Sequence, residues 1–251
     1  MSHLHFHFVD EGETSRHWPV VTWSLIVVNI AVYLAMLWSP TDYDVLVREY
    51  ALTPDDAQWW QYLSSSFMHG GILHLAGNLF FLLVLGDNVE DVLGPLPFLA
   101  LYLLGGVAGD GLMVAVNPHL AVPSLGASGC IATVAGAYAV LFWNSMMEVD
   151  ACIGWIAFQV PVPALLFLMM LLGADVWLTA KHAGVLGPGG GINYVAHGVG
   201  FVVGLAAGAW VLGHGAVGRY RRLREGHLFF GYLPADLESP PRSRAGARRG
   251  R

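Results

Sequence analysis

The sequence predicts an all-α membrane protein whose core is a six-transmembrane-helix bundle. Composition is the first reason, because 55% of the 251 residues are hydrophobic and only 12% are charged, about half of the roughly 25% typical of a soluble domain. The mean hydropathy is +0.56. The second reason is that the chain contains several apolar runs, each close in length to the roughly 20 residues that a helix needs to cross the hydrocarbon layer. These observations exclude a disordered chain, a disulfide scaffold and an ordinary cytosolic globule.

Six runs are predicted to span the membrane, and each is apolar over most of its length. They cover residues 20–38, 71–89, 97–116, 128–143, 153–172 and 194–212. The fourth run is short, which indicates a helix that begins below the membrane surface. The predicted domains are an N-terminal segment (1–19), the membrane domain (20–213) and an Arg-rich tail (214–251).

Charge sets the expected orientation. Nine of the twelve basic residues are arginines that follow position 218, so the positive-inside rule places the tail in the cytoplasm. An even number of spans then puts the N-terminus there too. The loop 39–70 is acidic and rich in Trp and Tyr, which favours an external position partly within the headgroup layer. The absence of a transit-peptide pattern favours a multi-pass protein of a bacterial cell membrane.

Two other readings of charged or polar segments are weaker. A nucleic-acid-binding protein would carry its basic residues on a folded face, whereas here they gather in the tail, so no nucleic-acid partner is expected. The N-terminal run with His3, His5 and His7 alternates like a strand. We expect a free terminus there, and a metal site remains the alternative.

Four polar residues inside the predicted spans are candidates for function, because unpaired polar groups are costly in hydrocarbon. His74 and Asn78 lie in the second span, Ser128 opens the fourth and His197 opens the sixth. These three spans all run from the outer to the inner face. His74, Ser128 and His197 therefore share one shallow layer, and Asn78 lies one helical turn deeper than His74 on the same side.

A serine and a histidine at one depth indicate a nucleophile and its general base. No Asp or Glu occurs early in the even-numbered spans, so a dyad is expected rather than a triad. His74, the Asn78 amide and the Ser128 backbone N–H would supply donors for an oxyanion. No metal or cofactor is expected. Taken singly, His74 with Asn78 could instead form an interhelical hydrogen bond, and His197 could be a satisfied buried histidine.

Glycines flank both candidate residues. Gly126 and Gly129 bracket Ser128 and would allow a tight turn and close approach of a substrate backbone, although such a motif alone could equally serve helix packing. Gly200 and Gly204 are four residues apart, which gives the sixth helix a small-residue face. Packing of that face on the fourth helix would bring His197 to Ser128.

Together these residues resemble the rhomboid family of intramembrane serine proteases, over roughly residues 20–212. The motifs that carry the resemblance are Gly126-Ala127-Ser128-Gly129, Ala196-His197 followed by Gly200 and Gly204, and His69 with His74 and Asn78. The resemblance implies a rhomboid-like bundle with Ser128 as nucleophile and His197 as base and then acid. It implies oxyanion contacts from His74, Asn78 and Ser128, and a structural role for His69. It also implies transmembrane protein substrates, cut in the bilayer near its outer face.

Two positions depart from the family pattern. Gln61 follows Trp60 where the family commonly has Arg, which predicts weaker bonding within the first loop. Ala132 stands where many members have an aromatic residue against which the base stacks, and Tyr194 or Tyr138 could replace that ring.

Two other functions compete with proteolysis. One is a catalytically inactive rhomboid-like protein that binds and escorts transmembrane helices, and the other is a small transporter or channel. The sequence assigns neither the substrate nor the oligomeric state.

Overall fold

The computed structural model describes residues 18–143, 146–153, 156–163, 166, 168, 170 and 194–214. The described chain is predominantly helical. Its α-helices are α1 (Val20–Trp38), α2 (Tyr43–Tyr50), α3 (Gln61–Ser64), α4 (Ile72–Leu93), α5 (Pro95–Val116), α6 (Ser128–Leu141) and α8 (Tyr194–Gly213), with the 3₁₀ turns η1 (Pro54–Asp56) and η2 (Ser65–Phe67). Four of them, α1, α4, α5 and α8, are long and apolar enough to cross a membrane. The N-terminal histidines and the Arg-rich tail lie outside the described residues.

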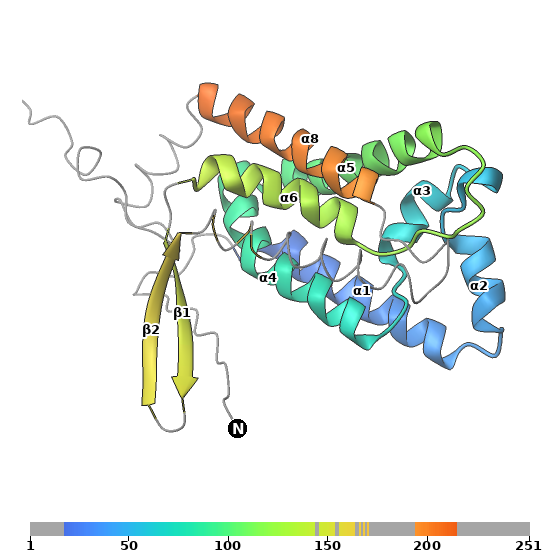
Figure 1. Ribbon diagram of the computed structural model, residues 1–251, viewed down its shortest axis with the longest axis horizontal. Coiled ribbons are helices and arrows are strands. Elements are labelled where there is room, and N and C mark those ends of the chain that lie inside the picture. The colour runs from blue at the N-terminus through green and yellow to red at the C-terminus, as the bar shows by residue number, and fades with distance from the viewer. Residues whose placement is uncertain are drawn as a thin grey trace, which may run out of the picture.

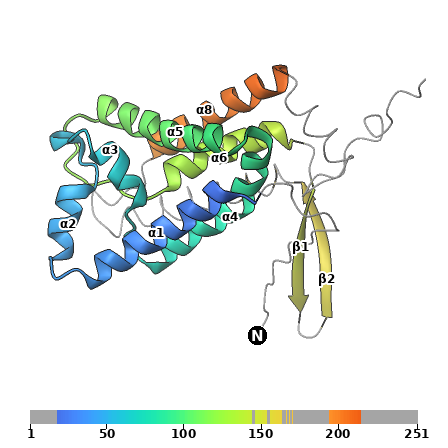
Figure 2. The same cartoon turned by 180° about the vertical axis from the view of Figure 1, so that it is seen from behind.

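The helices form one bundle in which α4, α6 and α8 begin at the same end, beside α2 and α3 (Figure 1). The view from behind shows the same arrangement (Figure 2). Helix α6 contacts α4, α5 and α8, and almost all its side chains from Cys130 to Leu141 are buried. Its 14 residues are too few to cross a bilayer alone. Neighbouring helices, rather than lipid, therefore surround it.

Small residues let α8 approach α6 closely. A Cβ atom at Gly200 would collide with the Gly129 carbonyl oxygen, and one at Gly204 would collide with the carbonyl oxygen of Thr133. Gly208 continues the row, since a Cβ there would lie 3.0 Å from the Ala137 carbonyl oxygen. In lipid, helices associate through such close packing because hydrocarbon offers little hydrophobic driving force. The spacing of Gly200 and Gly204 thus predicts the observed pairing of α6 and α8.

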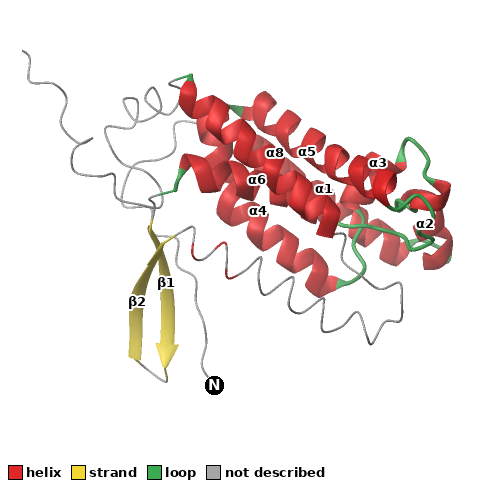
Figure 3. Ribbon diagram, turned by 45° about the horizontal axis from the view of Figure 1, so that its top comes forward, coloured by secondary structure: helices red, strands yellow, loops and turns green. Residues whose placement is uncertain are grey.

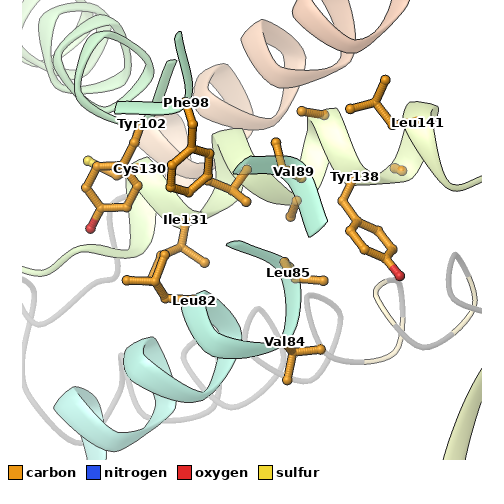
Figure 4. Close-up of a cluster of buried hydrophobic side chains, with 14 of the residues drawn as sticks. Leu82, Val84, Leu85, Val89, Phe98, Tyr102, Cys130, Ile131, Tyr138 and Leu141 are labelled. Atoms are coloured by element: carbon orange, nitrogen blue, oxygen red, sulfur yellow. The ribbon is translucent and has the colours of Figure 1, made fainter. Parts of the chain in front are cut away.

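The apolar core lies where α4, α5 and α6 meet (Figure 4). Each of these helices contributes large side chains that are almost completely buried. They are Leu82, Val84, Leu85 and Val89 from α4, Phe98 and Tyr102 from α5, and Ile131, Tyr138 and Leu141 from α6. This interdigitated layer fixes the depth of α6 against its neighbours and thereby the height of Ser128 at its start.

A buried carboxylate closes the opposite end of the bundle. Glu90, near the end of α4, accepts hydrogen bonds from the backbone N–H groups of Val21 at 2.9 Å and Thr22 at 2.8 Å, and from the Thr22 hydroxyl at 2.8 Å. The first N–H groups of a helix have no partner within the helix, and the helix dipole favours a negative charge there. Glu90 therefore caps α1 and ties it to α4.

The prediction of a helix over 153–172 is wrong for its first part. Strands β1 (Met146–Ile153) and β2 (Ile156–Pro163) form an antiparallel hairpin with Val149 opposite Val160. Figure 3 shows this hairpin apart from the helices. Pro161 and Pro163 disfavour a helix because each lacks a backbone donor and clashes with the preceding turn, and the β-branched and aromatic residues of β2 favour a strand. Helical backbone follows at Leu166, Leu168 and Met170.

Candidate active site

Ser128 and His197 meet at the start of two neighbouring helices. Ser128 is the first residue of α6, and His197 lies in the first turn of α8. The Ser128 Oγ and His197 Nε2 atoms are 2.5 Å apart, although 69 residues separate them in the chain. Both residues are half-buried. This hydroxyl and imidazole have the contact that general-base activation of a serine needs.

The turn before Ser128 brings His74 and Asn78 to the same place. Gly126 has a backbone φ of +129°, a conformation that residues other than glycine rarely adopt. A Cβ atom at Gly126 would lie 2.7 Å from both Cε1 and Nε2 of His74, and 3.7 Å from the Asn78 amide nitrogen. The absence of a side chain at Gly126 therefore leaves the space that the His74 ring occupies.

Asn78 presents a donor without a local acceptor. Its side chain is only 7% exposed, and its amide nitrogen has no hydrogen-bond partner within the described part of the chain. A buried donor that remains unpaired costs free energy. Such a group is available for an acceptor that arrives with a ligand.

The first loop holds the segment that precedes Ser128. Leu52 and Ser124 exchange two backbone hydrogen bonds, at 3.0 and 2.8 Å, and the Gly126 N–H donates to the Ser65 carbonyl oxygen at 2.9 Å. Residues of the loop 39–70 thus fix the approach to α6 by backbone contacts, which depend on loop geometry rather than on side-chain identity.

Gln61 forms several hydrogen bonds within this loop, and weaker bonding than with Arg stays a prediction. Gln61 is 3% exposed, and its amide nitrogen donates to the carbonyl oxygens of Arg48 and Glu49, both at 3.2 Å. Its side-chain oxygen accepts the Gln58 N–H at 3.0 Å. The Trp60 indole N–H also donates to the Glu49 carbonyl oxygen, at 3.1 Å. A neutral amide here both donates and accepts, so it joins two parts of the loop.

His69 packs behind His74. Its side chain is fully buried, and its ring meets that of His74 edge to face with centroids 5.1 Å apart. Burial lowers the pKa of His69 from 6.5 to about 4, and charge on His74 acts in the same direction. His69 therefore remains neutral at physiological pH and supports the ring of His74 through packing.

The buried imidazole of His69 predicts acid sensitivity. The pKa of His69 is 6.5 in the unfolded chain and about 4 in the folded chain. The free energy of unfolding should therefore fall as the pH drops from about 6.5 to about 4. The shift corresponds to roughly 3 kcal/mol at full effect. His69→Phe keeps an aromatic ring and removes the titration. In detergent, the melting temperature of wild type should fall more between pH 7 and pH 4 than that of His69→Phe. Equal falls would contradict this role.

Of the two proposed ring replacements for Ala132, Tyr138 lies away from His197. Tyr138 lies ten residues beyond Ser128, about 15 Å along the helix, and stacks on Phe142 with ring centroids 4.7 Å apart. The prediction for Tyr138 is therefore wrong, while the Tyr194 side chain lies outside the described residues.

Backbone packing beside His197 fixes the start of α8 instead. A Cβ atom at Gly109 would lie 2.6 Å from the carbonyl oxygen of Ala196, and one at Gly129 would lie 3.6 Å from the Ala196 Cβ. Gly129 thus contributes to contact between helices rather than to the turn before Ser128.

Three buried polar residues of α5 and η2 that lie close to the segment before Ser128 were not identified from the sequence. Asp110, Ser65 and Ser66 are all buried, at 8%, 3% and 4% exposure. The Ser65 hydroxyl lies 3.5 Å from the Asp110 carboxylate. Asp110 is the single charged residue of the predicted span 97–116, a signal that should have marked it as a candidate.

Comparison with known proteins assigns the family. Rhomboid-related protein 3 of Homo sapiens is 33% identical over 159 residues, which cover 62% of this chain and 37% of that protein. Rhomboid protease GluP of Bacillus subtilis is 33% identical over 125 residues, or 47% of this chain and 24% of the protease. Rhomboid protein 1, mitochondrial, of Saccharomyces cerevisiae is 27% identical over 216 residues, or 84% of this chain and 58% of that protein. The chain thus spans less than two thirds of these relatives. Residues 56–214 match the family described as Rhomboid domain, and the chain belongs to the rhomboid family of membrane proteins.

Proposed function

We propose that this protein is an intramembrane serine endopeptidase that hydrolyses peptide bonds in or near transmembrane segments of membrane proteins. The observation that carries the proposal is the 2.5 Å contact between Ser128 Oγ and His197 Nε2. A serine hydroxyl is a weak nucleophile until a neighbouring base takes its proton. The relatives named rhomboid proteases lend support, since they include GluP and a putative protease, YdcA, both of Bacillus subtilis.

In the proposed reaction, His197 Nε2 accepts the hydroxyl proton as Ser128 Oγ attacks the scissile carbonyl carbon. The tetrahedral intermediate collapses when the imidazolium gives this proton to the leaving amine, which leaves an acyl-enzyme ester on Ser128. His197 then takes a proton from water, whose oxygen attacks the ester. Return of that proton to Ser128 Oγ releases the new carboxyl terminus and restores the dyad.

The oxyanion of each tetrahedral intermediate needs donors that are in place beforehand. We assign this role to His74, Asn78 and the Ser128 backbone N–H. The positions of His74 and Asn78 against Gly126 support it, as does the lack of a partner for the Asn78 amide nitrogen among the described residues. The Ser128 N–H belongs to the first turn of α6, where backbone donors are free of helical partners.

We further propose that the substrate helix arrives from the bilayer. Ile72 and Leu73, which precede His74, are 63% and 86% exposed, so apolar surface borders the site and suits contact with lipid or a substrate helix. A helix hides its carbonyl groups in hydrogen bonds, so a segment that unwinds easily should be cut in preference.

The predicted membrane placement belongs to the same proposal. We assign the protein to the cell membrane, with the segment 1–19 and the tail 214–251 in the cytoplasm and the first loop outside. Exposed aromatic residues of that loop, Trp59 at 81% and Tyr43 at 44% exposure, suit the headgroup layer.

The test pairs Ser128→Ala with wild type in detergent, with a fluorescent transmembrane peptide and a fluorophosphonate probe. We expect wild type to cleave the peptide and to carry the probe on Ser128, and Ser128→Ala to do neither. Peptide binding without cleavage by wild type would favour the inactive escort function instead. Equal cleavage by both proteins would rule out the dyad.

A further inference from the structure

The buried carboxylate of Asp110 has no part in the proposed chemistry, yet it lies behind both halves of the dyad. Asp110 belongs to the last two turns of α5, at the end of the bundle where α2 and α3 lie (Figure 1). A carboxyl group within an otherwise apolar span is expensive and is usually retained for a purpose. Its neighbours indicate that purpose.

Toward the serine, Asp110 contacts the η2 turn. The Ser65 hydroxyl is 3.5 Å from Asp110 Oδ2, and the Ser65 carbonyl oxygen accepts the Gly126 N–H at 2.9 Å. The next residue of the turn, Ser66, has its Oγ 3.6 Å from the Cys130 sulfur. Because Gly126 and Cys130 lie two residues before and two after Ser128, η2 holds the nucleophile on both sides.

Toward the histidine, the residue beside Asp110 touches α8. A Cβ atom at Gly109 would lie 2.6 Å from the Ala196 carbonyl oxygen and 2.9 Å from the Ala196 Cα, and His197 follows directly. Two consecutive residues of α5 therefore reach the two halves of the dyad, one by backbone contact and the other through η2.

We propose that Asp110 is a positioning residue that sets the separation of Ser128 from His197 through Ser65. The inference rests on the proposed protease function. A displacement of about 1 Å in a reacting group can lower a rate by up to about 100-fold without weakening substrate binding. Loss of the Asp110 contact should thus appear in kcat rather than in KM.

The experiment compares Asp110→Ala, Asp110→Asn and Ser65→Ala in the full chain, with kcat, KM and the rate of fluorophosphonate labelling of Ser128. We expect Asp110→Ala to lower kcat and the labelling rate about 10-fold or more, with KM within about 2-fold of wild type. Asp110→Asn keeps an acceptor for the Ser65 hydroxyl and should restore activity to within about 3-fold of wild type. Ser65→Ala should match Asp110→Ala, and their combination should cost no more than either alone.

Leu25→Ala is the matched control for stability, since it truncates a buried residue of α1, a helix that carries none of the proposed catalytic or positioning residues. It should lower the melting temperature and leave kcat per folded molecule unchanged. If wild type is labelled at Ser128 and both Asp110→Ala and Ser65→Ala keep kcat within about 3-fold, this inference is wrong and the protease function stands. If Asp110→Ala does not fold, Ser65→Ala alone decides. If wild type neither cleaves nor binds the probe, the protease function fails and this inference fails with it.

Discussion

Replacement of His197 by Ala should lower peptide hydrolysis by about two to four orders of magnitude while the bundle stays folded. His197 Nε2 lies 2.5 Å from Ser128 Oγ, so its removal leaves the hydroxyl without a base. The residues of a dyad act as a unit, and the double variant Ser128→Ala/His197→Ala should be no slower than either single variant. Initial rates on the fluorescent peptide, with melting temperatures of each protein, measure both effects.

His214 provides a matched control for this substitution. It directly follows the other end of the same helix, where it is exposed and its ring centroid lies 4.4 Å from that of Trp210. His214→Ala removes an imidazole just after the end of α8, far from Ser128, and should keep the wild-type rate. A residual rate in His197→Ala above about a tenth of wild type would remove the histidine from the proposed mechanism.

Replacement of Gly204 by Ala should destabilise the protein by about 3 kcal/mol or more. The added Cβ would overlap the Thr133 carbonyl oxygen and lie 2.8 Å from the Ala137 nitrogen. Both atoms belong to the backbone of α6, so relief requires movement of one helix away from the other. That movement would also separate His197 from Ser128, so activity should fall together with the melting temperature.

Gly198→Ala is the control for the helix propensity of glycine. Gly198 also lies in α8, but a Cβ there meets no atom within 4 Å. Because Ala is a better helix former by about 1 kcal/mol, Gly198→Ala should leave the melting temperature unchanged or raise it. Equal melting temperatures for Gly204→Ala and Gly198→Ala would contradict the close packing of α6 and α8.

Predictions from the sequence succeeded for features that the local residue pattern and the surrounding solvent determine, such as the positions of the long helices. Runs of apolar residues predicted α1, α4, α5 and α8 to within a few residues, because a bilayer imposes both length and composition on a helix. The glycine spacing in α8 predicted its contact with α6. Hydropathy does not predict the hairpin of β1 and β2, because it does not distinguish a strand from a helix, whereas the two prolines of β2 disfavour a helix.

Other features depend on contacts between distant segments. Gln61 bonds the first loop because the carbonyl oxygens of Arg48 and Glu49 lie within its reach, and Glu90 caps α1 although 68 residues separate it from Thr22. Neither contact follows from periodicity, since each needs the loop or the bundle to be folded first.

By itself the sequence determined that the protein belongs in a membrane and that a serine and two histidines begin helices of the same direction. Only the tertiary structure decided that Ser128 contacts His197, that Gly126 packs against His74, and that Asp110 contacts the η2 turn beside Ser128. The physical reason is that composition and periodicity report the solvent around each segment, whereas distances within a site depend on how the backbones of α5, α6 and α8 pack.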